Sequence, residues 1–255
     1  MLSKFLITLA ASASGALAAT PPGFEPGSET SLLVTFGNVA ALDGAVVAQE
    51  TTQTAPTIAT QSQLDGTSFA VLMIDLDIPT ANPPQTNTLL HWLQTGLTQS
   101  SMAVSLNTTQ GSTSAFVFSV PEDEEALAPY IGPAPPARIP LSHRYTEIVV
   151  DTSDVSTEGL ASLEAAAANR MGFNAQSVLT SAGLVDKVVA GNFFNVTNPG
   201  PVSDGTASNS TTGNGNGTNS SNPPSQVPVP AAANSQQAST SLLALITIVV
   251  AFFTL

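Results

Sequence analysis

The chain has 255 residues, a formal net charge of −13 and no cysteine, and only 9% of its side chains are charged. Between residues 21 and 200, four basic side chains stand against seventeen acidic ones, so this segment carries the whole net charge. Binding to a phosphate backbone requires clustered Lys and Arg, which excludes a nucleic-acid-binding protein. The absence of cysteine excludes a disulfide-stapled fold and any site built on thiolate ligands.

Residues 1–19 have the pattern of a secretory signal peptide. Lys4 is followed by an apolar run and then by the small residues Ala16-Leu17-Ala18, an A-x-A cleavage pattern. The run is too short to cross a bilayer as a helix. We therefore expect a folded domain over residues 20–198 that matures in the secretory pathway. The alternative for residues 1–19 is a buried N-terminal helix.

The domain is expected to be mainly β. Runs rich in β-branched and large apolar residues are separated by Gly, Pro, Asn and Thr, and they predict six strands, at 31–36, 68–74, 89–96, 114–120, 144–150 and 187–196. Their length and turn-rich spacing favour a sandwich of two antiparallel sheets.

Two helices are predicted late in the domain. Ser156 and Thr157 are candidate N-caps for the first, and Asn174 is a candidate N-cap for a shorter one that ends before Gly183. The first helix is predicted from apolar residues at helical spacing, which are Leu160, Leu163, Ala167 and Met171.

Four features of the domain could carry chemistry. Asp75 and Asp77 follow an apolar strand, and their spacing points both carboxylates to one face if the strand continues. Such a pair is costly unless a cation or hydrogen-bond donors lie beside it. His91-Trp92 lies inside the next strand. Residues 132–136 form a loop whose three prolines make a rigid rim, and residues 143–145, His-Arg-Tyr, begin a further strand.

The order and spacing of these features resemble the phosphatidylethanolamine-binding protein family. Its members carry an Asp-x-Asp-x-Pro segment, a His on the following strand, a Gly/Pro-rich loop and a His-Arg-Tyr triplet. Residues 183–194 resemble the family's closing helix-to-strand segment, so the resemblance covers most of residues 31–196. It implies a Greek-key β-sandwich with a small preformed pocket for a phosphate or a phospholipid head group, and a binding protein without cofactor or metal.

Positions in the pocket are also implied by the resemblance. The pocket would be lined by Asp75, His91, Gly132, Ala134, His143 and Tyr145. It would be supported by Asp77, Pro79, Pro135, Pro136, Arg144 and Phe194, with a cis bond between Ile78 and Pro79. The chain departs from the family twice: Ala134 stands where a second Gly is frequent, and Phe194 replaces a tyrosine that closes the pocket and would supply a hydroxyl donor.

The net charge constrains such a pocket. A domain at −13 repels anions at long range, so binding must depend on short-range donors: two imidazoles, backbone N–H groups and a tyrosine hydroxyl. We expect binding to strengthen as the pH falls through the range in which histidine titrates.

Other interpretations of the same residues stay open. His91 alone is typical of a core histidine, and Asp75 and Asp77 alone are typical of turns. Together with His143 these residues are also suitable ligands for zinc or manganese. A serine hydrolase is disfavoured because G-x-S-x-G is absent. Since the family includes inhibitors of serine carboxypeptidases, an extracellular peptidase inhibitor is one alternative function, and a structural surface glycoprotein with a vestigial pocket is another.

The C-terminal part predicts display at the cell surface. Residues 199–235 are rich in Asn, Ser, Thr, Gly and Pro, which predicts a disordered stalk. Residues 236–255 end in an uncharged apolar run preceded by small residues, a pattern typical of a glycosylphosphatidylinositol (GPI) attachment signal, with a short tail-anchor helix as the alternative. N-glycosylation is predicted at the sequons Asn107, Asn195, Asn209, Asn216 and Asn219.

Overall fold

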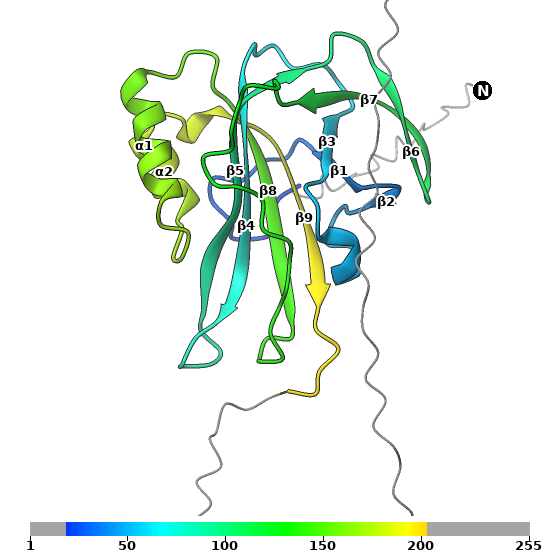
Figure 1. Cartoon of the computed structure of the whole chain (residues 1–255), viewed down its shortest axis with the longest axis vertical. Helices are drawn as coiled ribbons and strands as arrows, with labels where there is room; N and C mark the ends of the chain where they lie inside the picture. Colours follow the sequence, from blue (N-terminus) through cyan, green and yellow to red (C-terminus); the bar gives the residue numbers. More distant parts are fainter. Residues whose placement is uncertain (1–18, 203–255) are drawn as a thin grey trace, which may run out of the picture. The chain divides into compact units, whose positions relative to one another are not determined.

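The structure, a computed structural model, describes residues 19–202, so most of the predicted signal peptide, most of the predicted stalk and all of the predicted GPI signal lie outside it. Paired strands run antiparallel, in the order β2-β1-β3-β7-β5-β4-β8-β9, and β6 pairs with β7 (Figure 1). The strands are β1 (Leu33–Phe36), β2 (Val39–Ala40), β3 (Thr57–Thr60), β4 (Phe69–Pro79), β5 (Thr86–Gln99), β6 (Val104–Thr108), β7 (Gly111–Ser119), β8 (Ser142–Asp151) and β9 (Val188–Thr197).

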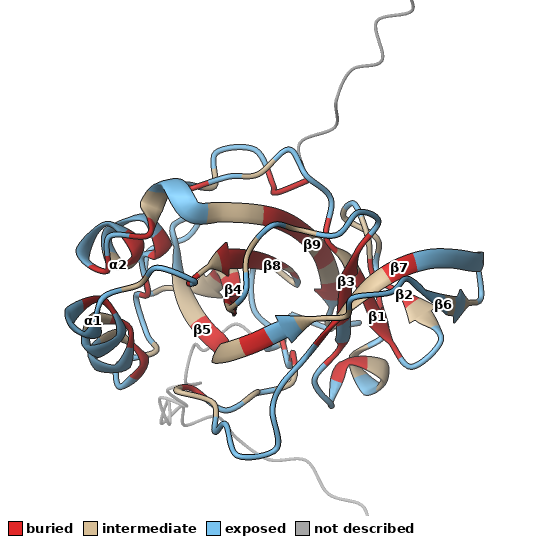
Figure 2. Ribbon diagram, turned by 90° about the horizontal axis from the view of Figure 1, so that it is seen from above, coloured by how far each residue is buried: buried red, intermediate tan, exposed pale blue. Residues whose placement is uncertain are grey.

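The strands form two halves that face each other. One half is β5-β4-β8-β9 and the other is β2-β1-β3-β7, and they are joined where the last two residues of β5 pair with the end of β7. The ring of Phe36 on β1 meets Phe194 on β9 edge-on, with centroids 5.3 Å apart, so the two ends of the curled sheet enclose one apolar core (Figure 2). The predicted mainly β, antiparallel sandwich is confirmed.

The central strands are buried on both faces. Along β4, Val71 and Met73 point into the core between the two halves, whereas Leu72 and Ile74 point to the other face. The second face is covered by α1 (Thr157–Ala167) and α2 (Ala175–Ser181). Two short 3₁₀ turns, η1 (Gln49–Thr52) and η2 (Val185–Lys187), complete the elements. Burial on both faces explains why these strands are continuous apolar runs in the sequence.

Ser156 and Asn174 are confirmed as helix caps, whereas Thr157 is the first residue of α1. Helix α1 is shorter than its apolar pattern indicates. Ser156 accepts a hydrogen bond from the Gly159 N–H at 3.1 Å, and Asn174 accepts one from the Ser177 N–H at 2.8 Å. Because α1 ends at Ala167 and the chain then returns to the edge of β5, Met171 lies outside the helix. Met171 is exposed, and so is Leu160 at the other end of the predicted apolar stripe.

The sequence pattern missed three strands and one geometric detail. Strands β2, β3 and β6 are short or mostly polar, so no long apolar run marks them. The prediction of a cis bond between Ile78 and Pro79 is wrong, because β4 continues in register through both residues, with Pro79 opposite Thr86 on β5.

None of the helices within residues 19–202 is long and apolar enough to cross a membrane.

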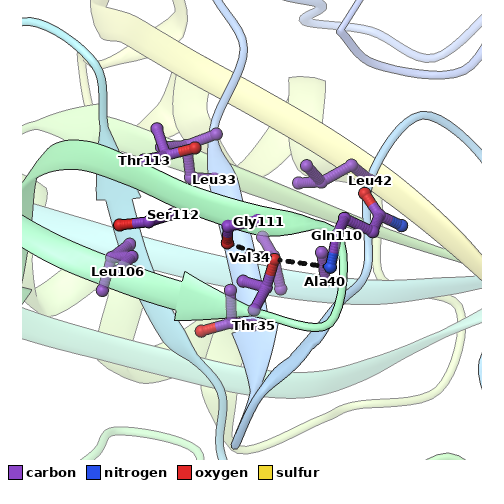
Figure 3. A pocket seen from close by; sticks show the side chains of 11 residues that line it. Leu33, Val34, Thr35, Ala40, Leu42, Leu106, Gln110, Gly111, Ser112 and Thr113 are labelled. Atoms are coloured by element: carbon purple, nitrogen blue, oxygen red, sulfur yellow. Dashed lines mark hydrogen bonds between the residues drawn. The ribbon is translucent and has the colours of Figure 1, made fainter.

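A cavity of about 180 Å³ lies between the β1–β2 pair and the β6–β7 hairpin (Figure 3). Its walls include Leu33, Leu106 and Thr113, and none of its lining residues is charged. The chemistry-bearing side chains of the domain therefore lie elsewhere.

Candidate functional site

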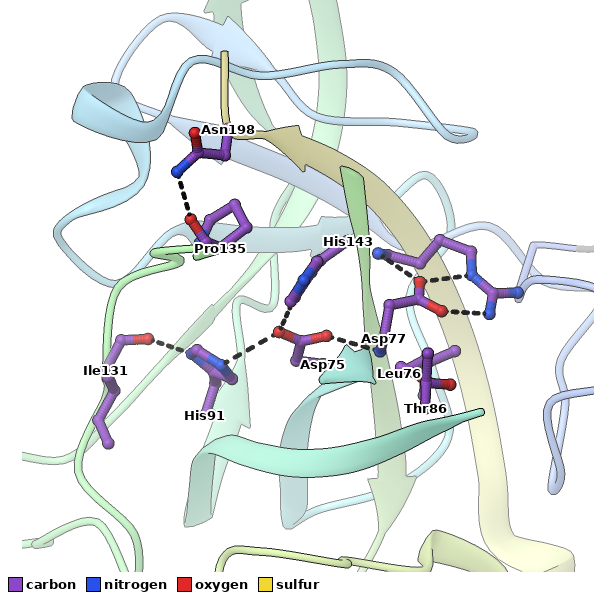
Figure 4. A network of polar contacts seen from close by, with 10 residues as sticks. Asp75, Leu76, Asp77, Thr86, His91, Ile131, Pro135, His143 and Asn198 are labelled. Carbon is purple, nitrogen blue, oxygen red and sulfur yellow. Dashed lines mark hydrogen bonds and ion pairs between the residues drawn. The ribbon is translucent and has the colours of Figure 1, made fainter. Parts of the chain in front are cut away.

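The centre of the sheet brings four predicted pocket residues together. Asp75 comes from β4, His91 from β5 and His143 from β8 (Figure 4). Tyr145 also lies on β8, and these three strands are neighbours in the sheet. Each of the four residues is at most 3% exposed. Strand pairing thus assembles residues that are up to 70 positions apart in the sequence.

A bulge in β5 determines where His91 points. The register pairs Met73 with Trp92 and Ile74 with Leu90, which leaves His91 as an extra residue. Trp92 packs into the core between the halves and Leu90 packs on the helix side. A bulge re-aims the inserted side chain. His91 accordingly faces Tyr145, with ring centroids 5.2 Å apart.

Each histidine is held by one ring nitrogen. His143 Nδ1 lies 2.7 Å from Asp75 Oδ2, and His91 Nδ1 lies 2.6 Å from the carbonyl oxygen of Ile131. A carbonyl can only accept, so His91 Nδ1 carries a hydrogen. His91 Nε2 lies 4.0 Å from Asp75 Oδ2, beyond hydrogen-bond distance.

Three polar atoms of the site lack a partner. His91 Nε2, His143 Nε2 and the Tyr145 hydroxyl are all buried, and no hydrogen-bond partner for them exists among the described residues. Most buried polar groups in folded proteins are hydrogen-bonded, so three such atoms in one cluster require an explanation. A bound ligand that forms hydrogen bonds with them would provide one.

Asp77 is hydrogen-bonded both to Arg144 and to Asp75. Asp77 accepts hydrogen bonds from the Arg144 backbone N–H at 2.9 Å, from Nε at 2.8 Å and from Nη2 at 2.8 Å. Burial alone would raise the pKa of Asp77, but the bonds from Arg144 outweigh it and the pKa is lowered. The backbone N–H of Asp77 donates to Asp75 Oδ1 at 2.8 Å, a local bond of the kind that Asp forms in turns.

Asp75 and Asp77 have different donors. Asp75 meets His143, and Asp77 meets the next residue of β8, Arg144. Leu76 between them packs on the helix side with Ile74, and the β4–β5 register is irregular between Asp75 and Ile78. That both carboxylates point to one face stays a prediction. Each carboxylate then has its own donors, and the repulsion between them is relieved.

The proline-rich loop is anchored along its length. Pro133 O accepts from Gln53 Nε2 at 3.0 Å, and Pro135 O accepts from Asn198 Nδ2 at 2.8 Å. A Cβ at Gly132 would lie 2.7 Å from Gln53 Oε1 and 3.0 Å from Gln53 Cα, so glycine lets the loop pack closely on Gln53. Within the loop, Pro133 and Pro135 are buried, whereas Ala134 and Pro136 are exposed. These contacts agree with the predicted rigid rim.

Sequence reasoning missed the residues that hold the rim to the site. Gln53, Asn198 and Arg170 belong to no local motif, because their partners lie 41 to 80 residues away. Arg170 donates to the carbonyl oxygens of His91 at 3.2 Å and Pro129 at 2.8 Å. The one available signal was the scarcity of basic residues, which makes any arginine in this acidic domain conspicuous.

Phe194 forms the apolar wall of the site. Its ring stacks on Tyr145 with centroids 5.5 Å apart and an interplanar angle of 20°. Tyr145 itself is fully buried, and burial, followed by the charge of Asp75, raises the pKa of its hydroxyl. Tyr145 therefore stays a neutral donor. Phe194 supports its ring without adding a second hydroxyl.

The protonation of His91 is set mainly by burial. Burial lowers its pKa, and the hydrogen bond to Ile131 and the charge of Asp75 oppose this effect without reversing it. With Nδ1 bonded to the carbonyl, Nε2 of the neutral ring is an acceptor, and it becomes a donor only when the ring takes up a proton. An anion at this position would therefore favour proton uptake.

The family model for phosphatidylethanolamine-binding protein matches residues 31–194. The chain belongs to this family. It is 31% identical over 209 residues to Phomoidride biosynthesis cluster protein N of Talaromyces stipitatus, covering 76% of this chain and 96% of that protein. The resemblance inferred from the ordered motifs is confirmed.

Solved structures give similarities of fold. One is a carboxypeptidase Y inhibitor complexed with its cognate proteinase, with a TM-score of 0.45, 19% identity, and coverage of 65% of this chain and 82% of that chain. Another is a phosphatidylethanolamine-binding protein from Plasmodium vivax, with a TM-score of 0.45, 17% identity, and coverage of 66% and 85%.

Two further predictions concern metals and glycans. Within residues 19–202, no three His, Asp or Glu side chains are grouped so that they could hold a metal ion. Of the sequons, Asn107 is exposed on β6, whereas Asn195 is half-buried on β9 and its Nδ2 donates to Gly44 O at 2.6 Å. Asn209, Asn216 and Asn219 lie outside the described residues. Glycosylation of all five stays a prediction.

Proposed function

We propose that this member of the family is a non-catalytic binding protein for a phosphate group, free or as a phospholipid head group. The observation that carries the proposal is the cluster of three buried atoms without partners: His91 Nε2, His143 Nε2 and the Tyr145 hydroxyl. A buried polar atom left unpaired costs about 1–3 kcal/mol. Phosphate oxygens would accept from the Tyr145 hydroxyl and from each imidazole Nε2 that carries a hydrogen.

The existing hydrogen bonds of Asp75 favour an anion over a cation. Its Oδ2 is occupied by His143 and its Oδ1 by the Asp77 N–H, so the carboxylate is turned toward the protein. Its role is to orient the His143 ring so that Nε2 is left for a ligand. The groups available to a ligand are therefore two imidazole nitrogens and one phenol hydroxyl.

The surroundings support a head group carried by a lipid. Three of the four basic side chains between residues 21 and 200 are near the site in the chain or in space: Arg170 contacts His91, Arg144 follows His143, and Arg138 follows the loop. Ile131 and Met171 are 44% and 49% exposed on segments that bond to successive parts of the β5 edge. An apolar rim with nearby cations suits the interface of a phospholipid layer.

Calorimetry on the mature protein, purified from eukaryotic cells that express the full chain, tests the proposal, with inorganic phosphate and phosphoethanolamine as probes. We expect binding of both at pH 6 and weaker binding at pH 8. Tyr145→Phe should weaken phosphate binding roughly 5- to 10-fold, as expected for one lost hydrogen bond. Tyr130→Phe is the matched control, because that hydroxyl donates to Thr52 O at 2.7 Å and is not one of the three atoms.

Two outcomes would contradict the proposal: no binding at either pH, or equal losses in the two tyrosine variants. Vesicles of phosphatidylethanolamine separate the two sources of phosphate. Ile131→Ser with Met171→Ser should weaken vesicle binding if the lipid is the ligand, and should leave binding of inorganic phosphate unchanged.

Peptidase inhibition is the alternative function, and it makes a different prediction. An inhibitor would reduce the activity of a serine carboxypeptidase in proportion to its concentration, and Tyr145→Phe would leave that inhibition unchanged. Inhibition without any phosphate binding would favour this alternative.

We also propose that the chain is displayed at the cell surface on a GPI anchor. The support is the sequence of the C-terminal tail and its polar spacer. Phosphatidylinositol-specific phospholipase C should release the protein from intact cells. Retention after treatment would instead favour a tail-anchor helix.

A further inference from the structure

The first described residues are part of the folded domain. Ala19 and Thr20 are only 2% and 3% exposed. The segment that they begin continues to β9, where Leu32 N–H donates to Gly191 O at 2.7 Å and Gly191 N–H donates to Thr30 O at 2.9 Å. Residues 19–32 thus cover part of the edge of β9, the last strand in the sheet order.

Thr20 occupies a socket formed by Gly27, Ser28 and Gly191, which we call the Thr20 socket. The Ser28 N–H donates to Thr20 Oγ1 at 3.1 Å, and Ser28 O accepts from the Ala19 N–H at 3.1 Å. A Cβ on Gly27 would lie 2.9 Å from Thr20 Oγ1, and a Cβ on Gly191 would overlap Thr20 Cγ2. The socket accepts threonine only because both glycines lack side chains.

We propose that the chain is cut between Ala18 and Ala19 and that the new N-terminus docks with Thr20 in its socket. Ala16-Leu17-Ala18 has the small residues that a signal peptidase requires before its cleavage site. Hydrolysis of this peptide bond consumes one water and leaves a carboxylate on Ala18 and an amine on Ala19. The amine still donates to Ser28 O.

The position of the cut matters because Ser28 forms hydrogen bonds with both Ala19 and Thr20. A cut after Ala19, the limit expected from the sequence alone, would remove one of the two bonds to Ser28. A cut after Thr20 would leave the Thr20 socket empty. Processing and docking of the N-terminus are independent of the phosphate site.

N-terminal sequencing of the mature protein, purified from eukaryotic cells that express the full chain, tests the cleavage. The expected first residue is Ala19. A first residue of Thr20 or later, or retention of residues 1–18, would overturn the proposal.

Paired substitutions test the docking. Gly191→Ala should lower the melting temperature by roughly 2–10 °C, because its Cβ overlaps Thr20 Cγ2. Thr20→Ser removes that methyl and keeps the hydroxyl, so it should restore most of the loss. Gly27→Ala is the matched control, because its Cβ meets the hydroxyl that serine retains, and Thr20→Ser should not rescue it.

Rescue of both glycine variants, or of neither, would overturn the docking. If Gly191→Ala is too unstable to purify, the amount secreted gives the same readout. Secretion should then recover with Thr20→Ser in the Gly191→Ala chain and stay low in the Gly27→Ala chain.

Discussion

Strand β8 takes part in two buried polar regions, one around Asp75 and Asp77 and one around Glu147. The two regions differ in how many hydrogen-bond donors their carboxylates have. At the start of the strand, His143 and Arg144 donate to Asp75 and Asp77, and Arg144 alone gives Asp77 three hydrogen bonds. In its middle, Glu147 is fully buried, and Asn192 Nδ2 lies 3.4 Å from its Oε2. Its Oε1 has no partner among the described residues.

The difference in partners reverses the direction of the pKa shift. The bonds from Arg144 lower the pKa of Asp77, whereas burial raises the pKa of Glu147 to about 8 and the bond from Asn192 opposes that rise only in part. Asn192 is also committed to the neighbouring loop, where it donates to Ala41 O at 2.7 Å and accepts from the Asp43 N–H at 3.2 Å. A carboxyl group without a cation beside it is thus held in its neutral form.

The largest loss of stability is expected from removing the Asp75 carboxylate, which accepts hydrogen bonds from two buried donors. Asp75→Ala leaves His143 Nδ1 and the Asp77 N–H without their acceptor in a buried site, which should lower the free energy of unfolding by about 3–5 kcal/mol. Urea unfolding at pH 7 measures this loss. Asp65→Ala, at an exposed position, should change it by less than about 0.5 kcal/mol. Equal effects would show that Asp75 is not structurally important.

Substitution of Glu147, the carboxyl group with an unpaired oxygen, should raise the free energy of unfolding at high pH instead of lowering it. A carboxyl whose pKa is raised in the folded state loses stability as the pH rises from its unfolded value, about 4.5, to its folded value, about 8. The slope is on the order of 1 kcal/mol per pH unit. Glu147→Gln should therefore remove this pH dependence and make the protein more stable than the wild type at pH 8.

Urea unfolding at pH 5, 6.5 and 8 measures the Glu147 effect. A wild-type stability that does not fall over this range relative to Glu147→Gln would contradict the neutral carboxyl. A lower stability of Glu147→Gln at pH 8 would show that the carboxylate has a partner after all.

A smaller effect is expected for Asp77. Because its pKa is lowered, its contribution is present above about pH 3.8 and is lost as the pH falls through the folded value. The Arg144 side chain is 41% exposed, so solvent screening limits the charge contribution to about 1 kcal/mol or less. Asp77→Asn should lose that amount at pH 7 and should flatten acid unfolding below pH 4, measured by circular dichroism.

The smallest effect tests whether the two regions are independent. Phosphate affinity should rise several-fold between pH 7.5 and pH 5.5, because Nε2 of His91 becomes a donor only on proton uptake. Glu147→Gln should keep both the affinity and this pH dependence, measured by calorimetry. A change in either would show that the two polar regions of β8 are coupled.

Much of the site could be predicted because its residues lie in recognisable local patterns. Apolar runs located β4, β5 and β8, and the ordered motifs identified Asp75, His91, His143 and Tyr145. The bulge that aims His91 could not be predicted, because it depends on how β4 and β5 pair. Arg170 was likewise missed, since it contacts carbonyl oxygens about 80 residues earlier in the chain.

By itself, the sequence determined the mainly β class, the helix caps and the family, because these depend on short-range periodicity, on residues adjacent in the chain and on the order of motifs. Only the tertiary structure decided which polar groups have partners. Asp77 and Glu147 are both acidic residues within strands, and nothing local distinguishes them. One faces Arg144 and the other faces the apolar core, and that long-range difference sets their charge.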